Sequence, residues 1–190
     1  MPLISWSKDT LHSHQMSLLI QRSVKMIESL WLPYTTTTKI ISTSSYIHEL
    51  LKRSKTTCSV FQLALYYLFH NRKRIQQAVK TTMNPYIKCG RRMFLASLMI
   101  ASKYLNDKTF KNKVWAEITL LKVQEINQIE TCFLKLINYD IYVNPIIFEK
   151  WSQLLCGQPT VHCFPIIGIK RSSVQEHHPT KKLRPVQLNP

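Results

Sequence analysis

The residues best placed to do chemistry in this sequence are two charges within otherwise apolar helical patterns, Lys103 and Glu130. Glu130 lies four residues after Ile126 and three before Phe133, so a helix that turns about 100° per residue puts its carboxylate inside the apolar stripe. Lys103 lies near the end of residues 91–107, which are apolar on nearly every helical face. A charge that faces an apolar surface costs free energy unless it is paired or hydrogen-bonded. Both side chains therefore need a polar partner or a route to water.

Three arrangements would satisfy these two charges, and the hydrophobic pattern leaves all three open. Each side chain could bend out to water along its own aliphatic stem. The two could form an internal salt bridge. Both could also lie at the edge of an exposed apolar patch and bind polar backbone groups of another protein, because interfaces place orienting charges around an apolar anchor.

Patterns that would place catalysis or a cofactor in this chain are absent from the sequence. It contains no glycine-rich GxGxxG or P-loop motif and no kinase catalytic loop. The adjacent histidines His177 and His178 have no third ligand at a suitable spacing, so we expect no metal and no cofactor. The five cysteines form no CxxC pair, which favours buried, reduced thiols in a protein of the nucleus or cytoplasm.

Composition narrows the class of partner. A chain of 190 residues that is 45% apolar can form one globular domain with tails. Its 26 Lys and Arg against 10 Asp and Glu give a net charge of +16, which predicts an anionic partner such as nucleic acid, an acidic or phosphorylated protein, or a membrane face. No apolar run approaches 18 residues, so we expect no membrane-spanning helix.

Basic residues gather in two parts of the sequence. The first group surrounds the entry to the 91–107 stretch and consists of Arg72, Lys73, Arg74, Lys88, Arg91 and Arg92. It is either a solvated face or a docking patch for an acidic or phosphorylated substrate. The second group could serve as a nuclear-import signal and consists of Lys170, Arg171, Lys181, Lys182 and Arg184.

The elements that must position Lys103 and Glu130 are helices. The predicted helices span residues 10–31, 44–53, 58–75, 91–107, 113–121, 123–138 and 144–156. The 91–107 helix should be the centre of a small bundle, because a helix that is apolar all round cannot lie on a surface. A polar connection with an Asn84-Pro85 turn is expected over 76–90. Asn144 should cap the last helix, with Pro145 at its first position.

The chain divides into four parts on this basis. Residues 1–43 hold an N-terminal helix and a linker, 44–143 form the core unit, and 144–156 form a flanking helix. Residues 157–190 are basic and interrupted by prolines, and we expect them to be disordered.

Several strings within the core unit resemble the cyclin box of the fungal PHO-type cyclins. In order, they are LLKRSK (50–55), QLALYYL (62–68), RRMFL (91–95), ASKYLND (101–107), KVW (113–115), EINQIE (125–130), FL (133–134) and YD (139–140). Each string alone is weak evidence, but their order and spacing together are specific. The resemblance implies an all-α fold: a single five-helix cyclin box over 44–143 with an additional N-terminal helix and a C-terminal flanking helix.

The resemblance also implies a function. In cyclins, a lysine at the end of the third box helix and a glutamate in the fifth contact the kinase and flank its regulatory C-helix. The matching strings carry those kinase-binding roles to Lys103 and Glu130. The implied protein is a non-catalytic regulatory subunit that activates a PHO-type cyclin-dependent kinase in cell-cycle or nutrient control. Its partners would be the kinase and phosphorylation substrates such as transcription regulators.

The sequence departs from the pattern of cell-cycle cyclins in two ways, and one alternative function stays open. Only one box is evident, as in PHO-type cyclins, and no string matches the hydrophobic substrate-docking motif that cell-cycle cyclins carry on their first box helix. Substrate selection is therefore open. Cyclin-like folds also occur in basal transcription factors that grip DNA, so a basic nucleic-acid-binding protein is the alternative, although kinase binding is favoured.

Overall fold

The computed structural model describes residues 8–31 and 42–156. This part of the chain contains helices and no strand, so the predicted all-α class is confirmed. The helices are α1 Lys8–Trp31, α2 Thr43–Ser54, α3 Cys58–His70, α4 Arg72–Thr81, α5 Gly90–Leu105, α6 Asn112–Thr119, α7 Val123–Leu136 and α8 Pro145–Cys156.

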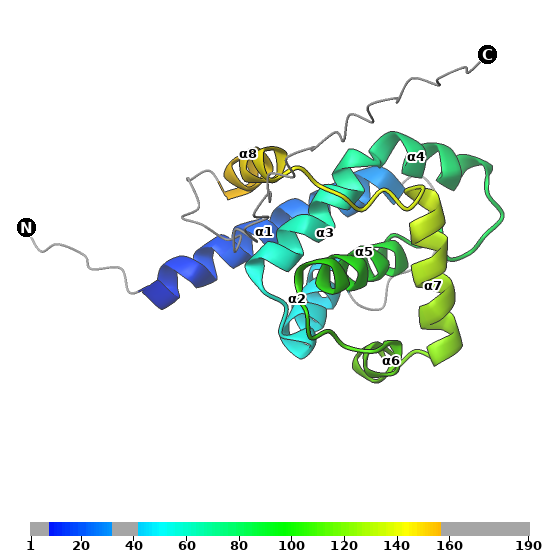
Figure 1. The fold of residues 1–190 in the computed structure, drawn as a ribbon, viewed down its shortest axis with the longest axis horizontal. Helices are drawn as coiled ribbons and strands as arrows, with labels where there is room; N and C mark the ends of the chain where they lie inside the picture. The colour runs from blue at the N-terminus through cyan, green and yellow to red at the C-terminus, as the bar shows by residue number, and fades with distance from the viewer. Residues whose placement is uncertain (1–7, 32–41, 157–190) are drawn as a thin grey trace, which may run out of the picture.

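Helix α5 is the centre of the bundle, as its composition predicts. Every residue from Met93 to Ala101 is buried, and the helix packs against α3, α7 and α1. Figure 1 shows α5 inside the group formed by α2, α3, α6 and α7. The ring of Phe94 meets that of Phe61 on α3 edge to face, with centroids 6.0 Å apart. This packing fixes the direction in which the last turn of α5 emerges from the core.

Polar caps set several helix ends where the sequence predicts them. The Thr57 side chain accepts the backbone N–H of Val60 and begins α3. The Asn144 side chain accepts the N–H of Ile146, so α8 begins at Pro145. Such caps satisfy N–H groups that the first helical turn leaves without partners.

The predicted single helix over 58–75 is wrong, because the helix is interrupted at Asn71. Asn71 is buried, and its side-chain amide donates to the carbonyl of Tyr67, which ends α3. A separate helix, α4, then runs to Thr81 across part of the predicted polar connection. Only Ile75 and Val79 of α4 are buried, so the sequence of this helix has too few apolar residues to reveal it.

Helix α1 packs on the bundle through buried apolar residues between Leu19 and Trp31. The indole N–H of Trp31 donates to the carbonyl of Ile87 at 2.8 Å, just before α5 begins. Helix α8 covers α1 and α3, and the Trp151 indole donates to the carbonyl of Gln62. Figure 1 shows α8 and α6 at opposite edges of the molecule. Residues 32–41 of the predicted N-terminal segment, 1–43, and the whole predicted tail, 157–190, lie outside the described residues.

We expect Gly90→Ala to destabilise the fold by about 1–3 kcal/mol, because the site has no room for a methyl group. A Cβ at Gly90 would lie 2.9 Å from Cγ2 of Ile27 and 3.0 Å from the Trp31 ring. Urea unfolding of both proteins measures the loss. Combined with Ile27→Ala, the loss should be smaller than the sum of the two single losses. Equal or greater stability of Gly90→Ala contradicts this account of the α1–α5 contact.

Candidate functional site

Lys103 and Glu130 meet at the end of the central helix. Lys103 lies in the last turn of α5 and Glu130 in the middle of α7, and the Lys103 Nζ lies 2.5 Å from the Glu130 Oε1. The Lys103 side chain is 35% exposed and that of Glu130 only 13%. Of the three arrangements that the sequence leaves open, the structure contains the internal salt bridge. A substitution at either residue therefore also affects the fold.

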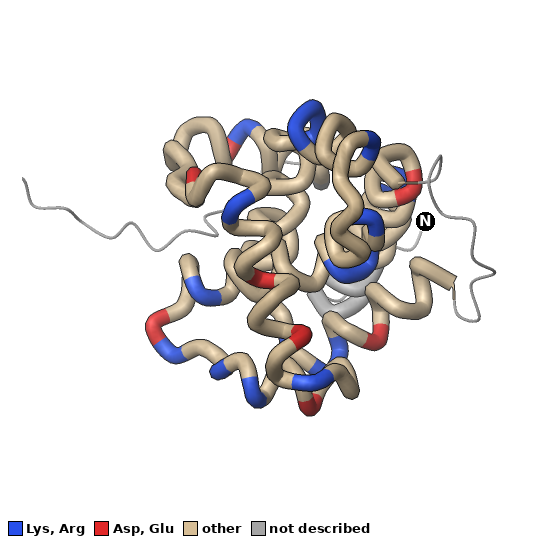
Figure 2. The backbone as a smooth tube through the Cα atoms, turned by 90° about the vertical axis from the view of Figure 1, so that its right-hand side faces the viewer, with Lys and Arg blue, Asp and Glu red and all other residues tan. Residues whose placement is uncertain are grey.

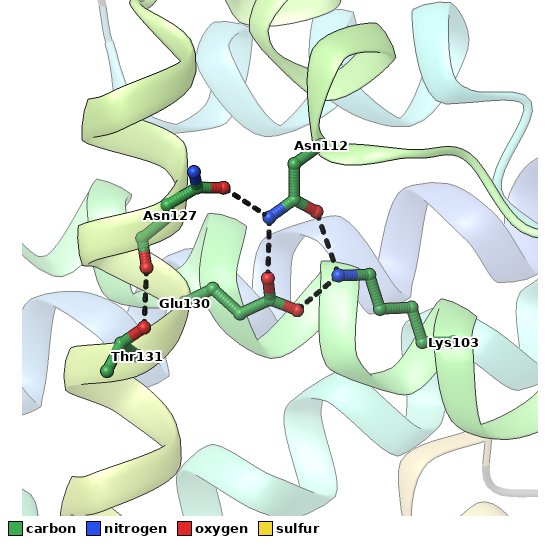
Figure 3. Close-up of polar contacts among 5 residues, drawn as sticks. All are labelled: Lys103, Asn112, Asn127, Glu130 and Thr131. Carbon is green, nitrogen blue, oxygen red and sulfur yellow. Dashed lines mark hydrogen bonds and ion pairs between the residues drawn. The ribbon is translucent and has the colours of Figure 1, made fainter.

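A third residue, Asn112, joins the pair (Figure 3). Asn112 is the first residue of α6. Its Oδ1 accepts from the Lys103 Nζ at 2.8 Å, and its Nδ2 donates to the Glu130 Oε2 at 2.7 Å. The same Nδ2 donates to Asn127 Oδ1 on α7, also at 2.7 Å. The polar cluster, defined as Lys103, Asn112 and Glu130, thus joins α5, α6 and α7, and Asn127 lies outside it.

Sequence reasoning missed Asn112. An asparagine at the start of a short helix is ordinary, because its side chain often caps that helix. Here the side chain instead contacts residues 9 positions earlier and 18 positions later. The only local signal was a polar residue close to the end of an apolar helix, and that signal is too common to be specific.

Two partly exposed apolar side chains are close in sequence to the charged residues of the polar cluster, one on α5 and one on α7. Tyr104 follows Lys103 and is 37% exposed. Leu134 lies one turn after Glu130 on α7 and is half-buried against the core. The cluster is therefore accompanied by apolar surface on both α5 and α7.

A buried tyrosine fixes the segment that follows α7. Burial raises the pKa of the Tyr67 hydroxyl well above its ordinary value, and nearby Tyr104, Tyr66 and Asp140 act in the same direction. The neutral phenol donates to the carbonyl of Ile141 at 2.8 Å. This hydrogen bond ties α3 to the chain just after α7.

The arginines of the predicted basic patch make internal contacts at different places. Arg92 pairs with Glu125 in the first turn of α7 at 3.0 Å, whereas Arg74 donates to the carbonyl of Ile137 just beyond the other end of that helix. The guanidinium of Arg72 lies 4.5 Å from the centroid of the Phe69 ring.

The remaining members of the patch differ in exposure. Arg91 lies over the ring of Tyr46, Lys88 is half-buried, and Lys73 is exposed. Figure 2 shows Lys and Arg spread over several helices, with acidic residues among them. Substrate docking by these residues stays a prediction. The second basic group, Lys170 to Arg184, lies outside the described residues.

The structure shows no candidate metal centre among the side chains that it describes. In residues 16–31 and 42–155, no three His, Cys, Asp or Glu side chains lie close enough to hold a metal ion. No helix in residues 8–31 and 42–156 is long and apolar enough to cross a membrane. Cys58, Cys89 and Cys132 are half-buried, rather than buried as the sequence predicts.

Comparison with known proteins connects this arrangement to a family. The family model described as cyclin matches residues 7–141, which include α1 and all but the last two residues of the predicted box. The G1/S-specific cyclin pas1 of Schizosaccharomyces pombe is 35% identical over 124 residues, covering 64% of this chain and 29% of that protein.

Two further relatives are similar over a shorter stretch. PHO85 cyclin-5 of Saccharomyces cerevisiae is 29% identical over 56% of this chain and 47% of its own length. Cyclin-U2-1 of Arabidopsis thaliana is 28% identical over 56% of this chain and 46% of its own length. The chain thus spans less than half the length of these relatives. The chain belongs to the cyclin family, and the resemblance to PHO-type cyclins that its sequence indicates is confirmed.

Proposed function

We propose that this cyclin is a regulatory, non-catalytic subunit that binds and activates a PHO-type cyclin-dependent protein kinase through Lys103 and Glu130. The observation that carries the proposal is the polar cluster, which holds two opposite charges at the exposed end of a helix that is buried from Met93 to Ala101. Relatives named as PHO85 cyclins and as a G1/S-specific cyclin support a kinase partner in cell-cycle or nutrient control.

The cluster keeps spare hydrogen-bonding capacity for a partner. An ammonium group has three N–H donors and an ionised carboxylate about four acceptor positions. Lys103 donates to Asn112 and Glu130, and Glu130 accepts one hydrogen bond at each oxygen. A kinase backbone carbonyl could therefore bind Lys103, and kinase N–H groups could bind Glu130, without breaking the cluster. N–H groups at the start of a helix are suited to a carboxylate.

Activation follows if the cyclin binds one kinase conformation better than another. A ligand shifts a two-state equilibrium only by its difference in affinity for the two states. Contacts that exist only when the regulatory helix of the kinase is in its active position stabilise that position. The kinase can then form its own Lys–Glu ion pair and transfer phosphate at its own active site. Tyr104 and Leu134 would supply the apolar part of the interface.

The alternative is nucleic-acid binding, which the net charge of +16 favours. Salt separates the two functions, because each neutralised phosphate releases counterions. A protein with six to ten phosphate contacts loses about 10³–10⁵ in affinity between about 50 and 200 mM salt.

We expect affinity for a purified PHO-type kinase to fall less than about tenfold over that salt range, because apolar contacts are not screened. Calorimetric titration at the two salt concentrations measures the change, and a duplex DNA titration is the control. Absence of kinase binding at both salt concentrations contradicts the proposed function. DNA binding with the steep salt dependence would support the alternative.

A further inference from the structure

Every polar hydrogen of the Asn112 side chain is used by a side chain of α7. One N–H of its amide lies toward Asn127 and the other toward Glu130, and its oxygen accepts from Lys103 (Figure 3). A side-chain amide has two donor hydrogens and one acceptor oxygen. Asn112 therefore contacts both members of the Lys103–Glu130 pair at once, from a different helix.

The orientation of the Asn112 amide is fixed by its neighbours. If the amide were reversed, its Nδ2 would face the ammonium of Lys103, which can only donate hydrogen bonds. Its oxygen would then face the carboxylate of Glu130, which can only accept them. Only the observed orientation satisfies both contacts with Lys103 and Glu130 as they stand.

We propose that Asn112 is a positioning residue that holds the Lys103 ammonium and the Glu130 carboxylate in their binding geometry before the kinase arrives. This inference rests on the proposed function. A lysine side chain that is ordered only on binding loses rotamer freedom at that moment, and an interface of preordered side chains avoids much of that loss. Within the cluster, Lys103 donates to Asn112 and Glu130, which uses two of its three N–H groups. The third N–H is available to a partner, because the side chain is 35% exposed.

The test compares Asn112 with Asn127, an asparagine of α7 that lies outside the polar cluster. Asn112→Leu keeps the size of the side chain and removes its hydrogen bonds with both charges, whereas Asn127→Leu removes a side chain that accepts a hydrogen bond from Asn112. We expect Asn112→Leu to weaken binding to a purified PHO-type kinase by about tenfold. Asn127→Leu should change it by less than about threefold, because the contacts of Asn112 with Lys103 and Glu130 remain. Thermal unfolding of both variants checks that they are folded.

A nuclear magnetic resonance signal of the free protein reports the position of Lys103 directly. Side-chain NH₃⁺ groups held by hydrogen bonds exchange slowly enough to be seen in ¹H–¹⁵N spectra, and we expect the Lys103 signal to weaken or shift in Asn112→Leu only. A merely structural role of Asn112 would lower the unfolding temperature without moving this signal.

The outcomes separate this inference from the proposed function. If wild type binds the kinase and Asn112→Leu binds equally well, Asn112 does not position the pair, although the proposed function stands. If wild type does not bind the kinase, the proposed function fails, and an unchanged Lys103 signal in Asn112→Leu overturns the positioning role independently. Should Asn112→Leu fail to fold, Asn112→Asp replaces only the donor and puts a second carboxylate against Glu130. Unchanged kinase affinity in that variant overturns the inference.

Discussion

Lys103→Glu is expected to abolish activation of a PHO-type kinase and to lower affinity for it by about 30-fold or more, because it reverses a charge in a desolvated contact. The variant also places two carboxylates together, because Lys103 contacts Glu130. Their repulsion is costly there, because the side chain of Glu130 is only 13% exposed. Stability therefore falls as well, and loss of activity alone would not separate the two effects. Kinase assays and urea unfolding must be measured on the same samples.

A charge-exchanged variant, Lys103→Glu with Glu130→Lys, is the matched control. It restores an ion pair between α5 and α7, and the Asn112 amide can turn over to suit it. We expect most of the lost unfolding free energy to return while kinase activation stays absent, because the partner then meets both charges reversed. If activation returns together with stability, the pair is structural and does not bind the kinase.

Phe94→Ala is expected to lower the free energy of unfolding by about 3–5 kcal/mol, the cost of removing a large ring from a tightly packed core. Phe94 is 0% exposed at the centre of α5 and meets Phe61 edge to face. Small domains have only about 5–15 kcal/mol of total stability, so this loss is a large fraction of the total. Urea denaturation followed by circular dichroism measures it.

Phe110→Ala removes the same side chain at an exposed site. Phe110 is 37% exposed and touches the ring of Trp115, so we expect a loss of only about 1–2 kcal/mol. Equal losses in the two variants would contradict the assignment of α5 as the core helix.

The sequence was sufficient to predict features that depend on strong local patterns. The α5 helix is apolar on nearly every face, so its central position follows from composition alone. The Thr57 and Asn144 caps follow from residue types that bond to nearby N–H groups. The break at Asn71 depends instead on a buried amide in a mostly polar segment, where hydrophobic periodicity is weak.

Only part of the candidate site could be predicted from the sequence. Lys103 and Glu130 each interrupt an apolar pattern, so each could be recognised as unusual. Their pairing could not be predicted, because 27 residues separate them and the angle between α5 and α7 decides it. The contacts of Arg92 with Glu125 and Tyr86 likewise depend on tertiary packing, so a basic stretch of sequence did not predict one free basic surface.

Activation of a purified PHO-type kinase is the measurement that tests the central claim most directly. Phosphorylation of a peptide is followed with kinase alone, with wild-type cyclin, and with Lys103→Ala or Glu130→Ala cyclin, after each variant is shown to be folded at the assay temperature. We predict strong activation by wild type and little or none by the two variants. Failure of wild type to bind or activate the kinase would contradict the proposed function, and normal activation by both folded variants would contradict the assignment of Lys103 and Glu130 as its binding site.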